Sequence, residues 1–413
     1  MKKIFLTLVI VSTLITNAQG LNFSTKEQIS KIDNYDFETH GYATIIPNSY
    51  SLEKYVPPIL KQEGGTCLGF ASLYYGLSTM YNKKFNITST IEKYAHSFDP
   101  YFIYTLINKS SNCEDGLIFE EAFELQSKIG AKKMFYPSFI ECDSNIDKGQ
   151  LYRVTKYTSP YKITNYYSTD PENINFITNI KKAIYGGYPV MVGVELKKSF
   201  EPYNLKNNPN GVKSDGLWNP KQNEKPDVGH AMCVIGYDNI KFGGCFKLAN
   251  SWSTKYGDKG YVYIKYADFK KSVKEAYIFE IDEYDNQTMS YPNYKRFNFS
   301  EPRYKNHFYE GEVNENYING FGIYSIDHKY FLIGEFKNGV KNGPFISINQ
   351  EVENLITIYE FENDEIVKKI SGFANNSENK DIVDFTKYIK KISPNQKVIV
   401  SDEAPDIDLS TKQ

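Results

Sequence analysis

The sequence lacks several features that would identify common classes of protein. The 413-residue chain has a formal net charge of −2, and no basic cluster marks a surface for nucleic acid. Its five cysteines and five histidines show no metal-ligand spacing, and no glycine-rich turn joins a strand to a helix as a phosphate site requires. We therefore infer no metal, no cofactor and no nucleic-acid partner.

Long apolar runs are also missing, apart from one at the N-terminus. Met1-Lys2-Lys3 precedes an apolar run over residues 4–15, and small or polar residues follow it up to Ala18. This pattern predicts a signal peptide over residues 1–18, because the apolar run is too short to span a bilayer. The sequence therefore predicts a secreted or periplasmic protein with no integral membrane segment. Residues 19–45 form a short leader, which either lies over the next domain or is trimmed.

A cysteine at the start of a helical pattern is the first candidate for catalysis. After Cys67, apolar residues recur at helical spacing: Phe70, Leu73, Tyr74, Leu77 and Tyr81. Thr66 is a candidate N-cap, and the unpaired N–H groups of a helix N-terminus favour the nucleophilic thiolate. Gly65 lets a substrate approach the backbone. The Gln62 amide and the backbone N–H of Cys67 can then donate to an oxyanion.

A histidine and an asparagine far along the chain complete the candidate site. His230 begins the apolar run 231–237, and Asn250 ends the run 244–249, with a predicted turn between the two runs. In an antiparallel hairpin these two positions are neighbours, so Asn250 can hold one ring nitrogen and turn the other toward Cys67. Trp252 would cover that hydrogen bond. A thiol, an imidazole and an amide in this order predict thiol acyl transfer.

Together these motifs resemble those of the papain-like cysteine peptidases. The matching segments are Gln62, Gly65-Thr66-Cys67, Phe70-Ala71-Ser72, His230 to Tyr237, Asn250-Ser251-Trp252 and Gly257 to Ile264. The resemblance covers residues 48–282. It implies that residues 46–285 form an α+β domain with a helical lobe and a β-barrel-like lobe. It implies that Cys67 is the nucleophile, His230 the general base and then acid, Asn250 the orienter of the imidazole, and Gln62 an oxyanion donor.

The resemblance also implies where substrate binds. Gly116 matches the family's glycine that pairs with substrate backbone, and Asp115, Gly65 and Trp252 complete the candidate substrate-binding set. Asp115 stands where the family has a glycine, and Leu68 stands where it usually has Trp, so substrate preference is not inherited from well-known members. The stretch before the nucleophile is shorter than the family's inhibitory propeptides. We therefore expect no inhibition of that kind.

Four cysteines remain once Cys67 is reserved for chemistry. The resemblance implies a disulfide between Cys113 and Cys142, because Cys142 follows a Tyr-Pro pair as a disulfide cysteine does in the family. Cys233 and Cys245 lie on the two runs of the predicted hairpin. They are either cross-strand neighbours or packed thiols, and the demanding geometry of a disulfide favours packed thiols.

A repeat with a period of about 23 residues follows the catalytic region. Its copies are Tyr309 to Val313 with Asn319 to Gly322, Leu332 to Phe336 with Asn342 to Phe345, and Ile358 to Asn363. They resemble MORN repeats, which implies a small antiparallel β-hairpin module over residues 303–371 after a linker at 286–302, with hairpins closed by Asn-Gly or Asn-Asp turns. Residues 372–413 are predicted to be a polar, partly disordered tail. A chain ending near Tyr291 is expected to fold and to cleave small peptides.

The sequence therefore predicts a cysteine endopeptidase that acts on peptides or proteins through an acyl-enzyme. An aminopeptidase or an acyl transferase could use the same residues, and a catalytically silent binding protein could keep the same fold. The repeats could bind a protein partner or a second copy of the chain, or could only stabilise the catalytic domain. The remaining histidines, at positions 40, 96, 307 and 328, are interpreted as surface or structural residues.

Overall fold

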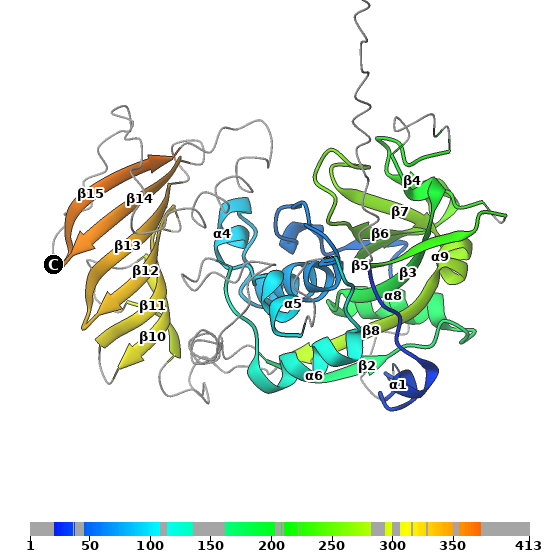
Figure 1. Ribbon diagram of the computed structural model, residues 1–413, viewed down its shortest axis with the longest axis horizontal. Helices are drawn as coiled ribbons and strands as arrows, with labels where there is room; N and C mark the ends of the chain where they lie inside the picture. Colours follow the sequence, from blue (N-terminus) through cyan, green and yellow to red (C-terminus); the bar gives the residue numbers. More distant parts are fainter. Residues whose placement is uncertain are drawn as a thin grey trace, which may run out of the picture.

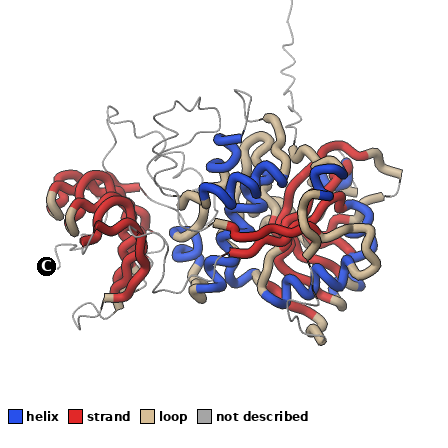
Figure 2. The backbone as a smooth tube through the Cα atoms, turned by 90° about the horizontal axis from the view of Figure 1, so that it is seen from below, coloured by secondary structure: helices blue, strands red, loops and turns tan. Residues whose placement is uncertain are grey.

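A computed structural model describes residues 20–35, 37, 45–107, 114–134, 162–202, 208, 210–221, 223–281, 294–299, 306–314, 317–327, 329–349 and 355–372. The predicted signal peptide, the predicted Cys113–Cys142 disulfide and the C-terminal tail lie outside these residues. A helical lobe lies between a β lobe and a separate C-terminal sheet (Figure 1), and the view from below agrees (Figure 2). In the described part of the chain, no helix has the length and apolarity needed to cross a membrane.

The helical lobe contains the helix that starts at the predicted nucleophile. Its elements are η1 (Glu53–Tyr55), α2 (Cys67–Gly69), η2 (Phe70–Leu77), α3 (Ser78–Lys84), α4 (Thr90–Ala95), α5 (Tyr101–Ile107) and α6 (Phe119–Ile129). The α-helical prediction is wrong over η2, which is a π-helix. The Ser78 hydroxyl donates to the Leu73 carbonyl at 3.2 Å, and every residue of η2 is buried. Tertiary packing therefore decides the local conformation here.

The β lobe is one mixed sheet with helices packed around it. Its strands are β1 (Ser49–Ser51), β2 (Ile163–Ser168), β3 (Val190–Lys197), β4 (Leu217–Trp218), β5 (Pro226–Asp238), β6 (Cys245–Ala249), β7 (Tyr261–Lys265) and β8 (Val273–Ile281). They pair in the order β2-β8-β3-β5-β6-β7-β4, with β1 on β5. The helices are η3 (Lys198–Phe200), η4 (Lys241–Gly243), α8 (Phe176–Gly186) and α9 (Tyr266–Ser272).

The predicted hairpin between residues 231 and 249 is confirmed. Strands β5 and β6 pair antiparallel, with Cys233 opposite Ala249 and Asp238 opposite Cys245. The Asp238 carboxylate accepts hydrogen bonds from the backbone N–H groups of the turn, which lowers the pKa of Asp238 and fixes the connection. Cys233 and Cys245 are therefore not cross-strand neighbours. Both are buried free thiols, as the packed-thiol alternative predicts.

The C-terminal sheet is an antiparallel meander in which each strand pairs with the next. Its strands are β9 (Tyr294–Asn298), β10 (His307–Asn314), β11 (Tyr317–Ile326), β12 (Tyr330–Lys337), β13 (Val340–Asn349), β14 (Leu355–Glu362) and β15 (Glu365–Gly372). Strand β9 lies in the stretch expected to be a linker. Asn338-Gly339 and Asn363-Asp364 form tight turns, and all four residues have positive φ. Asn319-Gly320 and Asn342-Gly343 instead lie inside β11 and β13, so they close no hairpin.

Two glycines let aromatic rings lie across the C-terminal sheet. A Cβ atom on Gly322 would come within 2.3 Å of the Tyr309 hydroxyl, and one on Gly334 within 2.7 Å of the Phe345 ring. Phe336 packs edge-on against both rings, with centroid distances of 5.6 Å to Tyr309 and 5.1 Å to Phe345. These residues form a small core of their own. Side chains larger than hydrogen at the glycines would displace the rings.

The C-terminal sheet packs on the helical lobe through a buried charged group. Glu310 of β10 is fully buried, and its carboxylate lies 3.4 Å from His96 Nδ1 and 3.6 Å from Lys133 Nζ. It also accepts a hydrogen bond from the hydroxyl of Tyr81, which lies on α3. The Phe308 ring stacks on His96 with a centroid distance of 5.7 Å. The sheet is therefore joined to the helical lobe, and His96 is a structural residue.

Candidate active site

Three side chains from distant parts of the sequence meet between the helical lobe and the β lobe. Cys67 begins α2, His230 lies within β5, and Asn250 directly follows β6. His230 Nε2 lies 2.8 Å from Asn250 Oδ1, so the hairpin holds the ring through the amide. The Cys67 sulfur accepts a hydrogen bond from the backbone N–H of Ala231, the residue after His230. The predicted nucleophile, base and orienter are therefore brought together.

Burial sets the protonation state of this group. Cys67 is completely buried, and desolvation raises the pKa of its thiol to about 11 although three backbone N–H groups favour the thiolate. Desolvation also lowers the pKa of the His230 imidazole to about 4, although the hydrogen bond that its Nε2–H donates to Asn250 Oδ1 raises that pKa. The backbone N–H groups thus favour the thiolate as expected, but in this covered state burial outweighs them. Both the thiol and the imidazole are therefore neutral here.

Aromatic rings cover the histidine, as the position of Trp252 predicted. The Trp252 ring centroid lies 5.3 Å from that of His230. The ring centroid of Phe200, the last residue of η3, lies 6.0 Å from that of His230. Phe200 also packs edge-on against Trp252 at 5.0 Å. Sequence reasoning missed Phe200, because no motif surrounds it. The rings exclude water from the bond between His230 and Asn250.

Gln62 is tied to the loop before the nucleophile. Its side-chain amide donates to the Gly64 carbonyl at 2.7 Å and accepts from the Ser251 hydroxyl at 2.5 Å. An amide nitrogen carries two N–H groups, so one remains to donate to an oxyanion. Gly65 is buried in the same loop. Thr66 precedes the helix as predicted, but its hydroxyl donates back to the Glu63 carbonyl at 2.7 Å and caps no helix N–H.

The leader lies over the domain, as one of the two alternatives predicted, and it crosses the predicted substrate-binding loop. The Asn22 side chain donates to the Gly116 carbonyl at 2.6 Å, and its backbone N–H donates to the Leu117 carbonyl at 3.0 Å. Asp115 is exposed, and its carbonyl accepts from the Tyr104 hydroxyl at 2.6 Å. The leader therefore occupies the backbone surface assigned to substrate. Among the described residues, no group of three or more His, Cys, Asp or Glu could hold a metal.

Acid is expected to destabilise the fold through His230. Its folded pKa of about 4 lies below the ordinary 6.5, so between these values the unfolded chain binds a proton that the folded chain does not. The free energy of unfolding should therefore fall as the pH drops from 6.5 to 4, by at most about 3 kcal/mol from this group. Urea unfolding at pH 7 and at pH 4 should show that the free energy of unfolding falls less between these pH values for His230→Gln than for wild type. Equal losses would contradict the assignment.

Part of this region matches a known sequence family. Residues 105–280 match the family described as papain family cysteine protease. The match includes His230 and Asn250 and begins after Cys67. Peptidase 1 of Dermatophagoides pteronyssinus is 26% identical over 103 residues, which are 25% of this chain and 29% of that protein. Cathepsin Z of Onchocerca volvulus is 26% identical over 137 residues, which are 33% of this chain and 39% of that protein. The chain thus covers well under half of these relatives.

Solved structures with a related arrangement include xylellain, a cysteine protease from Xylella fastidiosa. It is 17% identical to this chain, with a TM-score of 0.49, over 65% of this chain and 97% of xylellain. Procathepsin B from Trypanosoma congolense is 14% identical, with a TM-score of 0.47, over 65% of this chain and 89% of that chain.

Proposed function

We propose that the chain hydrolyses peptide bonds through a thioester on Cys67, because residues 105–280 match the papain family of cysteine proteases, which are hydrolases. The proposal is carried by the contact between His230 Nε2 and Asn250 Oδ1 at 2.8 Å, beside the buried Cys67. That contact uses one ring nitrogen and leaves Nδ1 to exchange a proton with the thiol. An endopeptidase is the specific activity that we propose.

The chemistry follows from these positions. The Cys67 sulfur attacks the substrate carbonyl carbon while His230 Nδ1 takes the thiol proton, and the carbonyl oxygen becomes an oxyanion. The second N–H of the Gln62 amide and the backbone N–H of Cys67 donate to that oxygen. His230 then returns the proton to the leaving amine, and a thioester remains. Water attacks the thioester with His230 as base, which releases the carboxylic acid and restores the thiol.

Two further features of the chain belong to the same proposal. The apolar run at residues 4–15 supports a signal peptide and therefore export to the periplasm or the cell exterior. The repeated Gly-Glu and Asn-Gly spacings support a MORN-like origin for the C-terminal sheet, which would offer its outer surface to a protein partner or a second copy. Sequencing of the mature N-terminus after expression in a secreting host tests the export. A start at Met1 would contradict it.

Hydrolysis of a defined peptide mixture tests the activity. A mixture of blocked and free-amino peptides, incubated at pH 7 with protein whose Cys67 reacts with iodoacetamide, should be cut at internal bonds in both sets, with the products identified by mass spectrometry. Removal of single residues from free-amino peptides alone would identify an aminopeptidase. A folded protein with an accessible Cys67 that cuts neither set would contradict the proposal and indicate the binding-protein alternative.

A further inference from the structure

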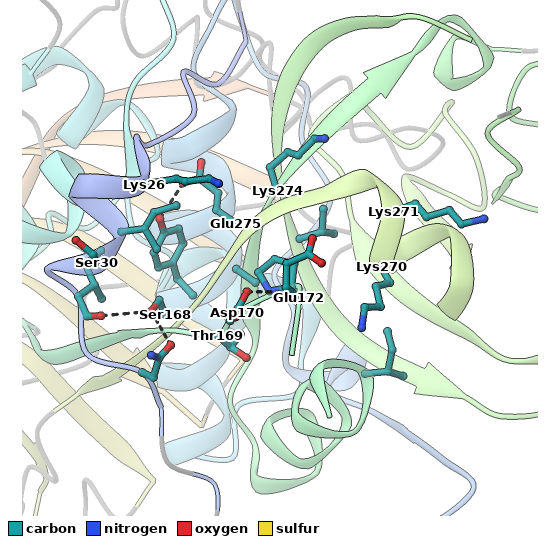
Figure 3. A pocket seen from close by; sticks show the side chains of 18 of the residues that line it. Lys26, Ser30, Ser168, Thr169, Asp170, Glu172, Lys270, Lys271, Lys274 and Glu275 are labelled. Atoms are coloured by element: carbon teal, nitrogen blue, oxygen red, sulfur yellow. Dashed lines mark hydrogen bonds between the residues drawn. The ribbon is translucent and has the colours of Figure 1, made fainter. Parts of the chain in front are cut away.

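The cavity next to helix α1 (Lys26–Ser30) does not reach the candidate active site. It has a volume of about 1150 Å³, and Figure 3 shows Lys26 and Lys271 of α9 on opposite sides of it. The three side chains of the candidate active site do not line it, and all three are buried. Their geometry is therefore set by the groups packed directly around them.

A tyrosine on the helix of the nucleophile contacts the residue that orients the imidazole. Tyr75 lies in η2, which continues directly from the helix that begins at Cys67. Its hydroxyl donates to the main-chain carbonyl of Asn250 at 3.1 Å. The same hydroxyl accepts a hydrogen bond from the backbone N–H of Leu60 at 3.3 Å. One hydroxyl group therefore joins three segments of the candidate active site.

The surroundings of this hydroxyl keep it a hydrogen-bond donor. Tyr75 is 1% exposed, and desolvation raises the pKa of its phenol well above the usual range. The phenol is therefore protonated at every pH at which the protein stays folded. Because an unpaired buried carbonyl costs about 1–3 kcal/mol, the bond from Tyr75 also satisfies a group that the burial of Asn250 would otherwise leave without this donor.

The other printed bonds of Asn250 all come from the β lobe. Its backbone N–H donates to the Gly260 carbonyl at 3.1 Å, and its Oδ1 accepts from His230 Nε2 at 2.8 Å and from the Ser251 N–H at 2.9 Å. These bonds fix Asn250 relative to the imidazole but not relative to the nucleophile. The bond from Tyr75 supplies that second reference, because Tyr75 and the nucleophile belong to one continuous helix.

The π-helical conformation of η2 determines which side chains face the β lobe. A π-helix closes i→i+5 hydrogen bonds and holds more residues per turn than an α-helix, so it displaces side chains around the helix axis. In this conformation Phe70, Tyr74 and Tyr75 pack in one hydrophobic cluster with residues of β5 such as Val234. The rings of the two tyrosines contact edge-on, with centroids 5.1 Å apart. The π-helix thus presents Tyr75 to the β lobe.

On the premise of the proposed peptidase function, we propose that Tyr75 is a positioning residue, whose hydroxyl holds Asn250, and through it the His230 imidazole, in register with the helix of the nucleophile. Without the hydroxyl, the hairpin keeps the bond between His230 and Asn250 but loses a fixed position relative to Cys67. The imidazole then lies less often where it accepts the thiol proton, so formation of the thioester slows while substrate binding is unchanged.

Tyr75→Phe tests the proposal, because it removes only the hydroxyl. With one fluorogenic peptide and protein whose Cys67 reacts with iodoacetamide, it should lower kcat by about 10- to 100-fold and leave KM within about twofold. A readout that needs no peptide is the rate of Cys67 alkylation by iodoacetamide at pH 7.5, which should fall by about fivefold or more because the imidazole accepts the thiol proton less often.

Tyr74→Phe is the matched control. Tyr74 is the neighbouring residue in η2, is 0% exposed, and donates its hydroxyl hydrogen bond to the Pro58 carbonyl at 2.7 Å. This variant therefore loses a bond of the same kind away from Asn250. It should lose as much free energy of unfolding in urea as Tyr75→Phe but keep kcat and the alkylation rate within about twofold of wild type.

The outcomes separate the positioning role from the peptidase function. Slower alkylation and a lower kcat in Tyr75→Phe alone would support the positioning role. Slower alkylation in Tyr75→Phe, with no hydrolysis by any of the proteins, would support the positioning role and refute the peptidase function. Alkylation of folded Tyr75→Phe at the wild-type rate or faster, or equal losses of rate in Tyr74→Phe, would overturn the positioning role whether or not peptides are cut.

Discussion

Replacing Cys67 by alanine is expected to lower peptide turnover by about 10⁴-fold or more, because alanine has no sulfur with which to form the thioester. His230→Ala should cost about as much, and the double variant should lose little more, since the two residues act as one unit. Asn250→Ala should keep weak activity, because Asn250 only positions the imidazole. Steady-state hydrolysis of one fluorogenic peptide by all four variants measures these differences.

A second buried thiol provides the control for this series. Cys233 is buried and free like Cys67, but it lies on β5 without an imidazole or amide partner. Cys233→Ala should therefore leave turnover within about twofold of the parent protein, apart from a modest loss of stability. Substantial hydrolysis by Cys67→Ala would contradict the mechanism. Wild-type turnover in Asn250→Ala would mean that another group holds the ring.

The second large effect concerns the buried carboxylate between the C-terminal sheet and the helical lobe. Glu310→Ala is expected to lower the free energy of unfolding by about 3 kcal/mol, because it leaves the Lys133 ammonium buried without its carboxylate. The expectation that a chain ending near Tyr291 folds and stays active is therefore revised. Such a chain would expose Tyr81, His96 and Lys133, and we expect it to be unstable or insoluble.

Glu335→Ala is the matched control, because Glu335 is an exposed carboxylate on the same sheet. Urea unfolding should place this variant within about 0.5 kcal/mol of wild type. Tyr81 lies on the helix that continues from Cys67, so Glu310→Ala should also lower peptide turnover at 37 °C as the fold loosens. If Glu310→Ala were as stable as Glu335→Ala, the sheet would be a separable module.

The residues of the candidate active site could be predicted to meet, because the proposed chemistry restricts both their types and their order. A thiol at a helix start, a histidine on an apolar strand and an asparagine at the end of the next strand carry that information in the sequence. The β5–β6 hairpin followed from its two apolar runs and its turn, and it brought His230 to Asn250 as expected. Local patterns therefore sufficed for this part of the site.

Contacts between distant segments could not be predicted. Tyr81 and Glu310 are 229 residues apart and belong to no shared motif, so nothing in the sequence pairs them. The leader residues Leu21 and Asn22 form too short a segment to show a pattern, although they cross the site. The π-helical conformation of η2 also depends on packing from all sides. In each case tertiary contacts determine the structure, and the periodicity of the sequence carries no information about those contacts.

The most direct test of the account is to find where an active-site-directed epoxide reacts. The described residues include three buried free thiols, Cys67, Cys233 and Cys245, and among them the sulfur of Cys67 is bonded by the backbone of Ala231, the residue after His230. After treatment of the protein with the epoxide at pH 7, peptide mapping by mass spectrometry should find one adduct, on Cys67, and the substitution His230→Ala should abolish it. An adduct on Cys233 or Cys245, or an adduct on Cys67 that persists without His230, would contradict the central claim.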